Sequence, residues 1–379
     1  MAQRLKTDWT LFLTTVLMVC VGLVIVYSAS SVTAELKFKS SSYFFLRQLG
    51  WAVLSFFVLM YMKKLDYRVL KSPVWAFAPL GMVLAMLVAV YFMDAKTHRW
   101  FRVGPLSLQP SELAKPALII FLAYFMTYRA KAINDARTVI SATVVIALVA
   151  LFVVAADLGT AFVLVVAAGL IFYVGGLERR YFAVAFALGA ILAAGAVLSK
   201  PYRLGRVIAF VDPGFKVLDR IDPEGRVKNY IHRSATAHDP DYQVRQSKIA
   251  VGSGGILGAG LMQGKQKILY LPEAHTDFIY AVVGEELGLW GSTAILAGFL
   301  IIMWRGLQLV WTAPDDFGRY LALGLTAVLV VQALINMSVV LGIAPTKGIP
   351  LPMISSGGSS LLSTLTSVGI LLSIGEHSG

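Results

Sequence analysis

Charged residues are scarce in this sequence. Asp, Glu, Lys and Arg make up 14% of its 379 residues, whereas hydrophobic residues make up 58%. A soluble domain of this length normally carries about 25% charged residues. The composition therefore argues against a soluble globular protein and for one embedded in a membrane.

Cysteine is almost absent as well, since Cys20 is the only one and lies inside the first apolar run. A single thiol excludes an internal disulfide bond and any zinc site built from several cysteines. We interpret Cys20 as a small residue of the packed core.

Motifs for nucleotide hydrolysis and for metal binding are also missing. There is no G-x-x-x-x-G-K-[ST] loop, so nothing in the sequence indicates ATP hydrolysis. No His-x-x-x-His or Glu-x-x-His spacing occurs on the side that we predict to be outside, so no metal ligands are assigned. The sequence is still compatible with a divalent cation, Mg²⁺ or Mn²⁺. One or two carboxylates and substrate phosphates could hold it, and such a site needs no fixed spacing.

Long apolar runs, in contrast, are abundant. Several approach the roughly 20 residues that span a bilayer core. They lie near residues 9–30, 44–62, 74–93, 111–128, 138–156, 158–176, 181–199, 277–304, 318–341 and 357–375. We therefore predict an all-α fold, a polytopic membrane protein of about ten transmembrane helices that forms a single domain over residues 1–379.

One long hydrophilic stretch, Lys200 to His275, interrupts this pattern between the seventh and eighth predicted helices. We expect it to form a long extracytoplasmic loop at about residues 200–275. Within it, Leu204–Val211 and Tyr242–Val251 mix apolar and basic residues. Each is equally compatible with an amphipathic helix at the membrane interface and with an irregular solvated loop.

Lysine and arginine positions predict the orientation, because short cytoplasmic loops carry an excess of both. The predicted inner loops hold Arg4, Lys6, Lys63, Lys64, Arg68, Lys71, Arg129, Lys131, Arg137, Arg179, Arg180, Arg305 and Arg319. The predicted outer loops and helix ends hold Lys37, Lys39, Arg47, Lys96, Arg99, Arg102, Lys115 and Lys347. Both termini are thus predicted to be cytoplasmic. Because topology explains many of the basic residues behind the net charge of +12, we predict no nucleic-acid partner.

Ionisable side chains at a membrane edge are costly, so each is a candidate functional group. In the predicted topology they gather on the outer side. They are His98, Arg99, Arg102, Glu112, Lys115, Asp157, Arg203, Arg206, Glu273, His275, Asp277 and Lys347. Their convergence on one compartment predicts an extracytoplasmic site.

Several of these residues also have a structural interpretation. Glu112 and Lys115 are three residues apart on a predicted helix and can form an intrahelical ion pair. Asp157 precedes a helix, where an N-cap is the favoured role. Asp277 can cap the eighth helix, but it also lies near Glu273 beside an apolar surface, where a carboxylate can be tuned as a base.

Two acidic residues, Glu285 and Glu286, lie roughly 12–14 Å deeper along that helix. Acids at such a depth need partners. We predict a structural pair with a basic residue from another helix.

The segment before the last helix has the composition of an anion site. Pro345, Pro350 and Pro352 stop any helix, and the Ser- and Gly-rich run 355–360 then opens one. A helix N-terminus with free N–H groups and Lys347 nearby suits a phosphate. A surface of small residues for helix packing is the alternative.

Several long motifs resemble those of the SEDS family (shape, elongation, division and sporulation). They are QKILYLPEAHTDFI at 266–279 with GEELG at 284–288, RW at 99–100, QPSELAK at 109–115, DLGT at 157–160 and PTKG at 345–348 with the Ser/Gly run after it. The resemblance covers essentially the whole chain and is closer to the FtsW division branch than to RodA. Ser356 and Ala156 depart from the residues usual there, tyrosine and proline, but neither replaces an ionisable group.

The resemblance implies a peptidoglycan glycosyltransferase of the bacterial inner membrane. Its substrate would be lipid II, the undecaprenyl-pyrophosphate-linked disaccharide peptide. Its partners would be a class B penicillin-binding protein, which is a transpeptidase, and other membrane proteins of the divisome. By resemblance, the essential acidic residue corresponds to Asp277 and the functional basic residue to Lys347.

The mechanistic hypothesis makes Asp277 the general base that deprotonates the 4-hydroxyl of the acceptor sugar. Positive charge for the leaving pyrophosphate would come from Lys347, Arg203, Arg206 and Lys267. The remaining predicted substrate-binding residues are Glu112, Lys115, Arg99, Asp157, Glu273, His275 and Ser359.

Two other classes stay open. A lipid II flippase would distribute functional charges through the membrane depth. A non-catalytic scaffold for division proteins would not need the Asp277 carboxylate.

Overall fold

The computed structural model describes residues 7–94, 97, 99–103, 106–199, 201–212, 217–222, 225, 227, 230, 242–268 and 270–377. Two residues of the predicted outer cluster, His98 and the side chain of Arg102, lie outside this described part.

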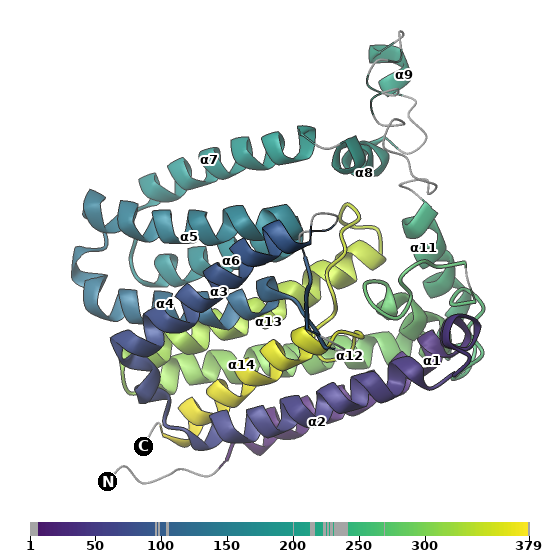
Figure 1. Ribbon diagram of the computed structural model, residues 1–379, viewed down its shortest axis with the longest axis horizontal. Coiled ribbons are helices and arrows are strands. Elements are labelled where there is room, and N and C mark those ends of the chain that lie inside the picture. Colours follow the sequence, from purple (N-terminus) through teal and green to yellow (C-terminus); the bar gives the residue numbers. More distant parts are fainter. Residues whose placement is uncertain are drawn as a thin grey trace.

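The described chain is a bundle of long helices (Figure 1). In chain order they are α1 (Trp9–Phe38), α2 (Tyr43–Lys64), α3 (Pro73–Met93), α4 (Pro110–Arg129), α5 (Ala136–Ala156), α6 (Leu158–Val174), α7 (Arg179–Leu198), α8 (Pro201–Val211), α9 (Leu218–Ile221), α11 (Tyr242–Gly254), α12 (Ile279–Thr312), α13 (Asp316–Val340) and α14 (Gly358–Glu376). Short 3-10 helices η1 (Tyr67–Lys71) and η2 (Ala130–Ala132) and a hairpin of β1 (Phe101–Val103) and β2 (Leu106–Leu108) complete the list.

The prediction of about ten membrane helices is confirmed. Within the described residues, nine helices are long and apolar enough to cross a membrane. The tenth, α6, is an apolar helix of 17 residues, which is near the lower limit of roughly 17–25 residues for a span.

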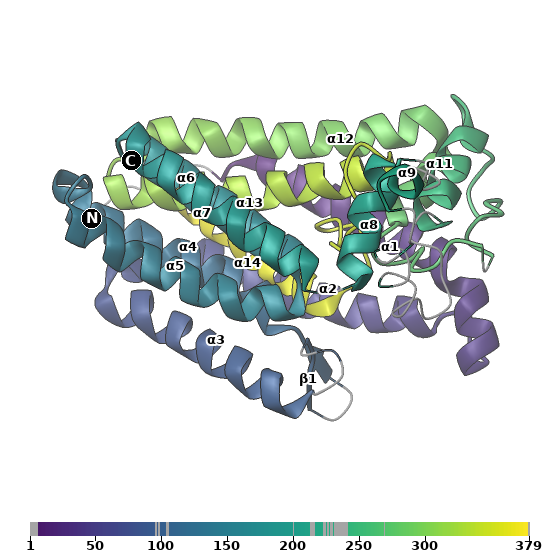
Figure 2. The ribbon, with the colours of Figure 1, turned by 90° about the horizontal axis from the view of Figure 1, so that it is seen from above.

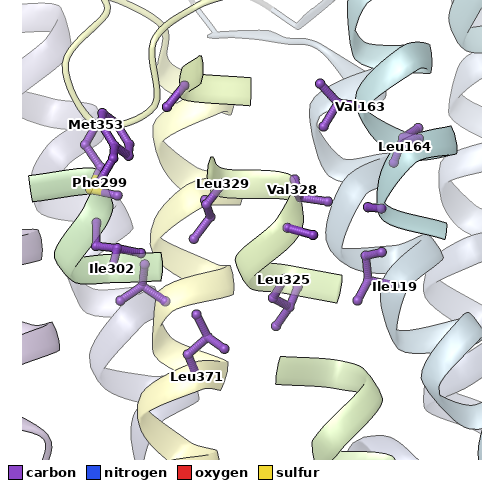
Figure 3. Packing of buried hydrophobic residues seen from close by; sticks show 14 of the residues in the cluster. Ile119, Val163, Leu164, Phe299, Ile302, Leu325, Val328, Leu329, Met353 and Leu371 are labelled. Carbon is purple, nitrogen blue, oxygen red and sulfur yellow. The ribbon is translucent and has the colours of Figure 1, made fainter. Parts of the chain in front are cut away.

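The core lies where α4, α13 and α14 meet, because these three are the most buried of the spans. Apolar side chains from α4, α6, α12, α13 and α14 interdigitate there (Figure 3). Ile119, Leu164, Leu325 and Leu371 are examples, and each is at most 2% exposed. The core is therefore built from helices whose polar residues, among them Lys115 and Asn336, support the loops at one end of the bundle.

Sequence signals explain where several helices begin. Asp8 accepts a hydrogen bond from the N–H of Leu11 and caps α1, and Asp315 does the same for α13 through Gly318. Proline stands in the first turn of α3 and of α4, where its missing N–H costs nothing.

Two features of the sequence prediction need correction. Cys20 is exposed on α1 rather than packed in the core. On a membrane-spanning helix an exposed position faces lipid, which accommodates a small thiol as well as the core does. The β1–β2 hairpin, paired from Phe101 with Leu108 to Val103 with Leu106, was not predicted, because strands of three residues leave too short a pattern.

The long stretch between the seventh and eighth spans is partly helical. Both pieces for which a helix and a loop were equally compatible, 204–211 and 242–251, lie within helices, α8 and α11. Both pieces are therefore helical rather than irregular, and their position at the membrane interface stays a prediction.

Helix α12 is broken at Gly288, whose φ of 64° and ψ of −155° are not helical. The loop after α11 is bonded into this break. The carbonyls of Glu285 and Glu286 accept from the N–H groups of Ala259 and Gly260 at 2.9 and 3.0 Å. Beyond the break, two N–H groups of α12 donate back to loop carbonyls, from Leu289 to Gly255 and from Trp290 to Ile256. The exchange satisfies backbone groups that the break would otherwise leave unpaired.

The bundle has two distinct ends. At one end the Thr7 hydroxyl donates to Glu376 at 2.6 Å, which brings the start of α1 next to the end of α14. The other end carries α8, α9, α11 and β1 (Figure 2). We call it the cavity end, because the candidate site lies there.

Candidate functional site

A cavity of about 500 Å³ opens at the cavity end of the bundle. Segments far apart in the sequence line it, from the β-hairpin region, the α5–α6 connection, α8, the loop before α12 and the loop before α14. The predicted site residues that line it are Arg99, Asp157, Arg203, Arg206, Glu273, Asp277, Lys347 and Ser359. The fold thus brings eight residues that the sequence singled out into one cavity.

Asp277 lies in the loop that precedes α12 and lines the cavity. The alternative role as helix cap is wrong, because the N-cap position is Phe278. No side chain of the described residues hydrogen-bonds or ion-pairs with the Asp277 carboxylate. Gly348 leaves room for it, since a Cβ at that glycine would stand 2.5 Å from the Asp277 Oδ2.

Burial raises the pKa of the Asp277 carboxyl to about 7. Arg99 and Arg206 lower this pKa, whereas the negative charges of Glu273 and Asp157 raise it. A carboxyl with a pKa near neutrality can exchange a proton at physiological pH, which an ordinary aspartate does poorly.

A tight turn presents Asp277 to the cavity. Glu273 has a φ of 56°, and its carbonyl accepts from the N–H groups of Thr276 and Phe278 at 3.1 and 3.2 Å. The Glu273 carboxylate accepts from the Thr276 hydroxyl at 2.8 Å. Left-handed backbone is uncommon for a side chain of this size, so the turn is held by these bonds rather than by local preference.

The loops that carry Asp277 and Lys347 are fastened to each other. Asn336 of α13 donates from one amide nitrogen to the carbonyls of Asp277 and Ile349, both at 2.7 Å. The Ser355 hydroxyl donates to the Thr276 carbonyl at 2.6 Å. The carboxylate and the lysine are therefore held in one frame by α13 and by the start of the last helix.

Cationic side chains also line the cavity. Arg206 donates to the Thr346 carbonyl and to the Gln243 side chain, both at 3.3 Å. Burial lowers the pKa of Lys347, with Asp157 opposing and Arg203 reinforcing that shift. Arg203 donates to the Val154 carbonyl at 2.9 Å and so ties α8 to the end of α5.

Asp157 combines both roles considered for it. Its carboxylate caps α6 by accepting from the N–H groups of Gly159 and Thr160 at 2.8 and 3.3 Å. The same carboxylate lines the cavity and pairs with Arg99 at 3.7 Å. A helix cap thereby positions a cation that faces the cavity.

Glu112 and Lys115 lie beneath the cavity and do not line it. They form the predicted intrahelical ion pair at 2.7 Å, fully within the core. Lys115 also donates to Gln332 at 2.6 Å, and Gln332 donates to the Pro350 carbonyl at 2.8 Å. This chain of contacts supports the loop that carries Lys347.

Two other predicted residues are not brought into the cavity. Lys267 is buried against Glu286 at 2.6 Å and Ser28 at 2.8 Å, so its charge is already neutralised away from the site. His275 packs its ring against Phe44, with ring centres 4.7 Å apart. Burial lowers the pKa of His275, Glu273 opposes that shift, and Lys37 reinforces it.

The predicted structural pair with a basic residue is present for Glu286 but not for Glu285, and the base does not come from another helix. The base that meets Glu286 is Lys267 from the preceding loop. Glu285 accepts instead from the backbone N–H groups of Lys265 and Gln266, at 2.7 and 3.1 Å. A break in the helix allows a nearby loop to supply the donors, and sequence spacing gave no sign of that break.

Sequence reasoning missed Gln332, Asn336 and Gly348. Polar amides spaced four residues apart on an apolar helix were the available signal, because a membrane helix has few reasons to bury them. Gly348 gave no signal by itself, since its importance depends on the approach of Asp277.

The charged groups of the cavity are arranged for an anion rather than for a metal ion. The described residues contain no cluster of three or more His, Cys, Asp or Glu side chains arranged to hold one. Arg99, Arg203, Arg206 and Lys347 face the three carboxylates of the cavity, which favours an anionic ligand.

The fold and the site together define a multi-pass membrane protein with a cation-rich cavity around a half-buried acid. Comparison with known proteins gives the family. The chain belongs to the FtsW/RodA/SpoVE family of cell cycle proteins, whose model matches residues 8–379.

The relatives of this chain span nearly its whole length. It is 37% identical to a protein of Geobacter sulfurreducens named probable peptidoglycan glycosyltransferase FtsW, over 97% of this chain and 95% of that one. It is 35% identical to the stage V sporulation protein E of Bacillus subtilis, over 99% of each chain.

Solved structures agree with this assignment. A chain from a peptidoglycan synthase complex that coordinates polymerization and crosslinking superposes with a TM-score of 0.75, 26% identity and 99% coverage of both chains. The rod shape determining protein RodA of Thermus thermophilus matches with a TM-score of 0.65 over 97% of this chain and 96% of that one. At 24% identity the second match supports the fold.

Proposed function

We propose that this chain is a peptidoglycan glycosyltransferase that polymerises lipid II into glycan strands. The observation that carries the proposal is the Asp277 carboxyl, which lines a cationic cavity without a partner among the described side chains and has a pKa of about 7. The family relatives, several of them named as such enzymes, support the same activity.

Asp277 serves as the general base in this proposal. Its carboxylate takes the proton of the 4-hydroxyl on the acceptor sugar. The hydroxyl oxygen attacks the anomeric carbon of the lipid-linked donor from the face opposite to the leaving pyrophosphate. A new carbon–oxygen bond forms, the bond to the phosphate oxygen breaks, and the electron pair leaves with the polyprenyl pyrophosphate. A base of this kind contributes about 10²–10⁴-fold to the rate.

The cations of the cavity stabilise the leaving group. Lys347, Arg203 and Arg206 line the cavity with Asp277, and charge placed before the reaction stabilises a developing anion without reorganisation. Lys267 takes no part, since Glu286 neutralises it. Ser359 in the first turn of α14 adds a polar group beside the free N–H groups of a helix start.

The cavity end faces the outside of the inner membrane in this proposal, with both termini in the cytoplasm. The partner is a class B penicillin-binding protein, consistent with the synthase complex that this fold resembles. A divalent cation, Mg²⁺ or Mn²⁺, would be held by one or two cavity carboxylates other than the base, with substrate phosphates supplying the remaining ligands.

A polymerisation assay with purified protein and labelled lipid II tests the proposal, with and without the transpeptidase partner. Wild type should give glycan ladders and Asp277→Ala none. Asp316→Asn is the matched control, because that acid is exposed and pairs only with Arg319 at the surface. An EDTA arm shows whether a divalent cation is needed.

Ladders from Asp277→Ala at normal protein levels would refute the general-base assignment. Absence of ladders from wild type with the partner bound would favour a flippase or a scaffold instead.

A further inference from the structure

The loop that follows α11 carries an exposed apolar tip. Leu257 is 82% exposed and Ile256 is 64% exposed. Leu261 and Met262, a few residues further on, are exposed as well. Apolar side chains exposed together in this way mark a surface that something covers.

Helix α12 shows where the membrane lies relative to this tip. The 18 residues from Leu287 to Trp304 are uncharged and are bounded by Glu286 and Arg305. At 1.5 Å per residue they span about 27 Å, close to the thickness of the hydrocarbon core. Trp290 and Trp304 are both exposed near the ends of this run, as expected for tryptophans at the two membrane interfaces.

Helix α1 independently indicates the same position for the membrane boundary. It runs antiparallel to α12, since Ser28 bonds to Glu286 at 2.7 Å and Asp8 pairs with Arg305 at 2.8 Å. Tyr27, next to Ser28, is exposed at the height of the upper boundary on α12. Two helices therefore place the interface near Gly288.

The tip is fixed at this height by the break in α12. The Leu289 N–H donates to the Gly255 carbonyl at 3.0 Å, and the Trp290 N–H donates to the Ile256 carbonyl at 3.5 Å. Ile256 and Leu257 consequently stand beside Trp290, level with the boundary of the hydrocarbon core.

Charge around the tip has the pattern of a membrane-interface segment. Residues 249–264 carry no charge, although they lie in the most hydrophilic part of the chain. Lys248 and Lys265 flank them, and both are exposed. Such lysines can reach lipid headgroups while the apolar residues between them enter the acyl region.

We propose that the tip formed by Ile256, Leu257, Leu261 and Met262 inserts into the lipid leaflet at the cavity end. Continuity with the lipid-facing side of α12 identifies lipid as the occupant. The tip is a shallow anchor that fixes the loop leading to Asp277 at the level of the headgroups. This inference concerns the fold's contact with lipid and does not depend on the proposed reaction.

Depth-dependent fluorescence quenching tests the proposal. Because Cys20 is the only cysteine, Cys20→Ala gives a background for single labels. The full-length chain carrying Leu257→Cys with an NBD label is placed in nanodiscs of phosphatidylethanolamine and phosphatidylglycerol. The discs contain lipid spin-labelled at carbon 5 or at carbon 16 of an acyl chain.

The carbon-5 probe should quench the fluorescence of the Leu257 label more strongly than the carbon-16 probe does. Ala297→Cys, at an exposed position near the middle of the uncharged run of α12, should show the reverse order, and Val217→Cys, exposed near α9, should respond to neither. A Leu257 label quenched by aqueous iodide and by neither lipid probe would overturn the proposal. Shielding that appears only when a membrane protein partner is added would overturn it in favour of a protein docking surface.

Discussion

The approach of Gly348 to Asp277 shows how one missing side chain shapes the site. A Cβ at residue 348 would meet the Asp277 Oδ2 at 2.5 Å and would push the carboxylate aside. Gly348→Ala should therefore lower the polymerisation rate by about 10–100-fold, since a displacement of about 1 Å can cost that much. Gly50→Ala in α2, which meets nothing within 4 Å, is the control and should keep full activity. Equal activity of both variants would show that the carboxylate is not confined there.

The raised pKa of Asp277 links activity and stability in opposite directions. The base acts only when ionised, so the rate should fall as pH drops through about 7. The folded state holds the proton more tightly than the unfolded state, so wild-type stability declines from about pH 4 to 7 and is then constant. Asp277→Asn avoids this loss. Its melting temperature should match that of wild type near pH 4 and exceed it increasingly up to pH 7. At pH 7 the difference in the free energy of unfolding should be on the order of a few kcal/mol.

Thermal unfolding in detergent from pH 4 to 8 measures this difference. A constant gap between Asp277→Asn and wild type at every pH would mean that burial does not perturb this carboxyl.

At the scale of elements, α13 acts as the support of the site. Asn336 holds the Asp277 and Ile349 carbonyls, and Gln332, one turn earlier, holds Pro350. Asn336→Leu should leave buried carbonyls unpaired, at about 1–3 kcal/mol each. Because Asn336 positions rather than reacts, the variant should lower kcat more than it raises KM, and it should shift the midpoint of the pH–rate profile.

A second asparagine provides the matched control for this prediction. Asn134 also makes two backbone contacts, with Gly176 and Glu178, but in the connections next to α5 and α7, away from the cavity. Asn134→Leu should lower the melting temperature without moving the pH midpoint. If both leucine variants lose stability and neither moves the midpoint, Asn336 has a purely structural role.

At the scale of the whole molecule, the two ends of the bundle should face different compartments. Val217 and Lys131 are both exposed. Val217 precedes α9 at the cavity end, whereas Lys131 lies in η2, between the ends of α4 and α5 that point away from the cavity. In a Cys20→Ala background, a membrane-impermeant maleimide added to spheroplasts should label Val217→Cys at once. It should label Lys131→Cys only after lysis. The opposite pattern would invert the proposed orientation.

The sequence alone predicted the ten helices closely, because each apolar run is long and uniform. The predicted run 111–128 became Pro110–Arg129, for example. Prediction fell short where geometry depends on contacts between distant segments. The break at Gly288 and the burial of Lys267 each depend on such contacts, with the loop after α11 and with Ser28 of α1. The extension of α1 to Phe38 was also missed. The sequence identified the ionisable residues near the membrane edge as a group. Only the fold shows which of them line the cavity and which are buried in the core.

Gly258 and Gly288 stand back to back where the loop enters α12, with φ values of 83° and 64°. A Cβ on either would collide with the backbone next to the other, and an unbroken helix would reclaim the two carbonyls that hold the loop. Each glycine permits the close approach of the two backbones only if the other position is also glycine. Over evolutionary time the two positions should be inherited as a unit, and a lineage that straightens this helix must also give up the loop.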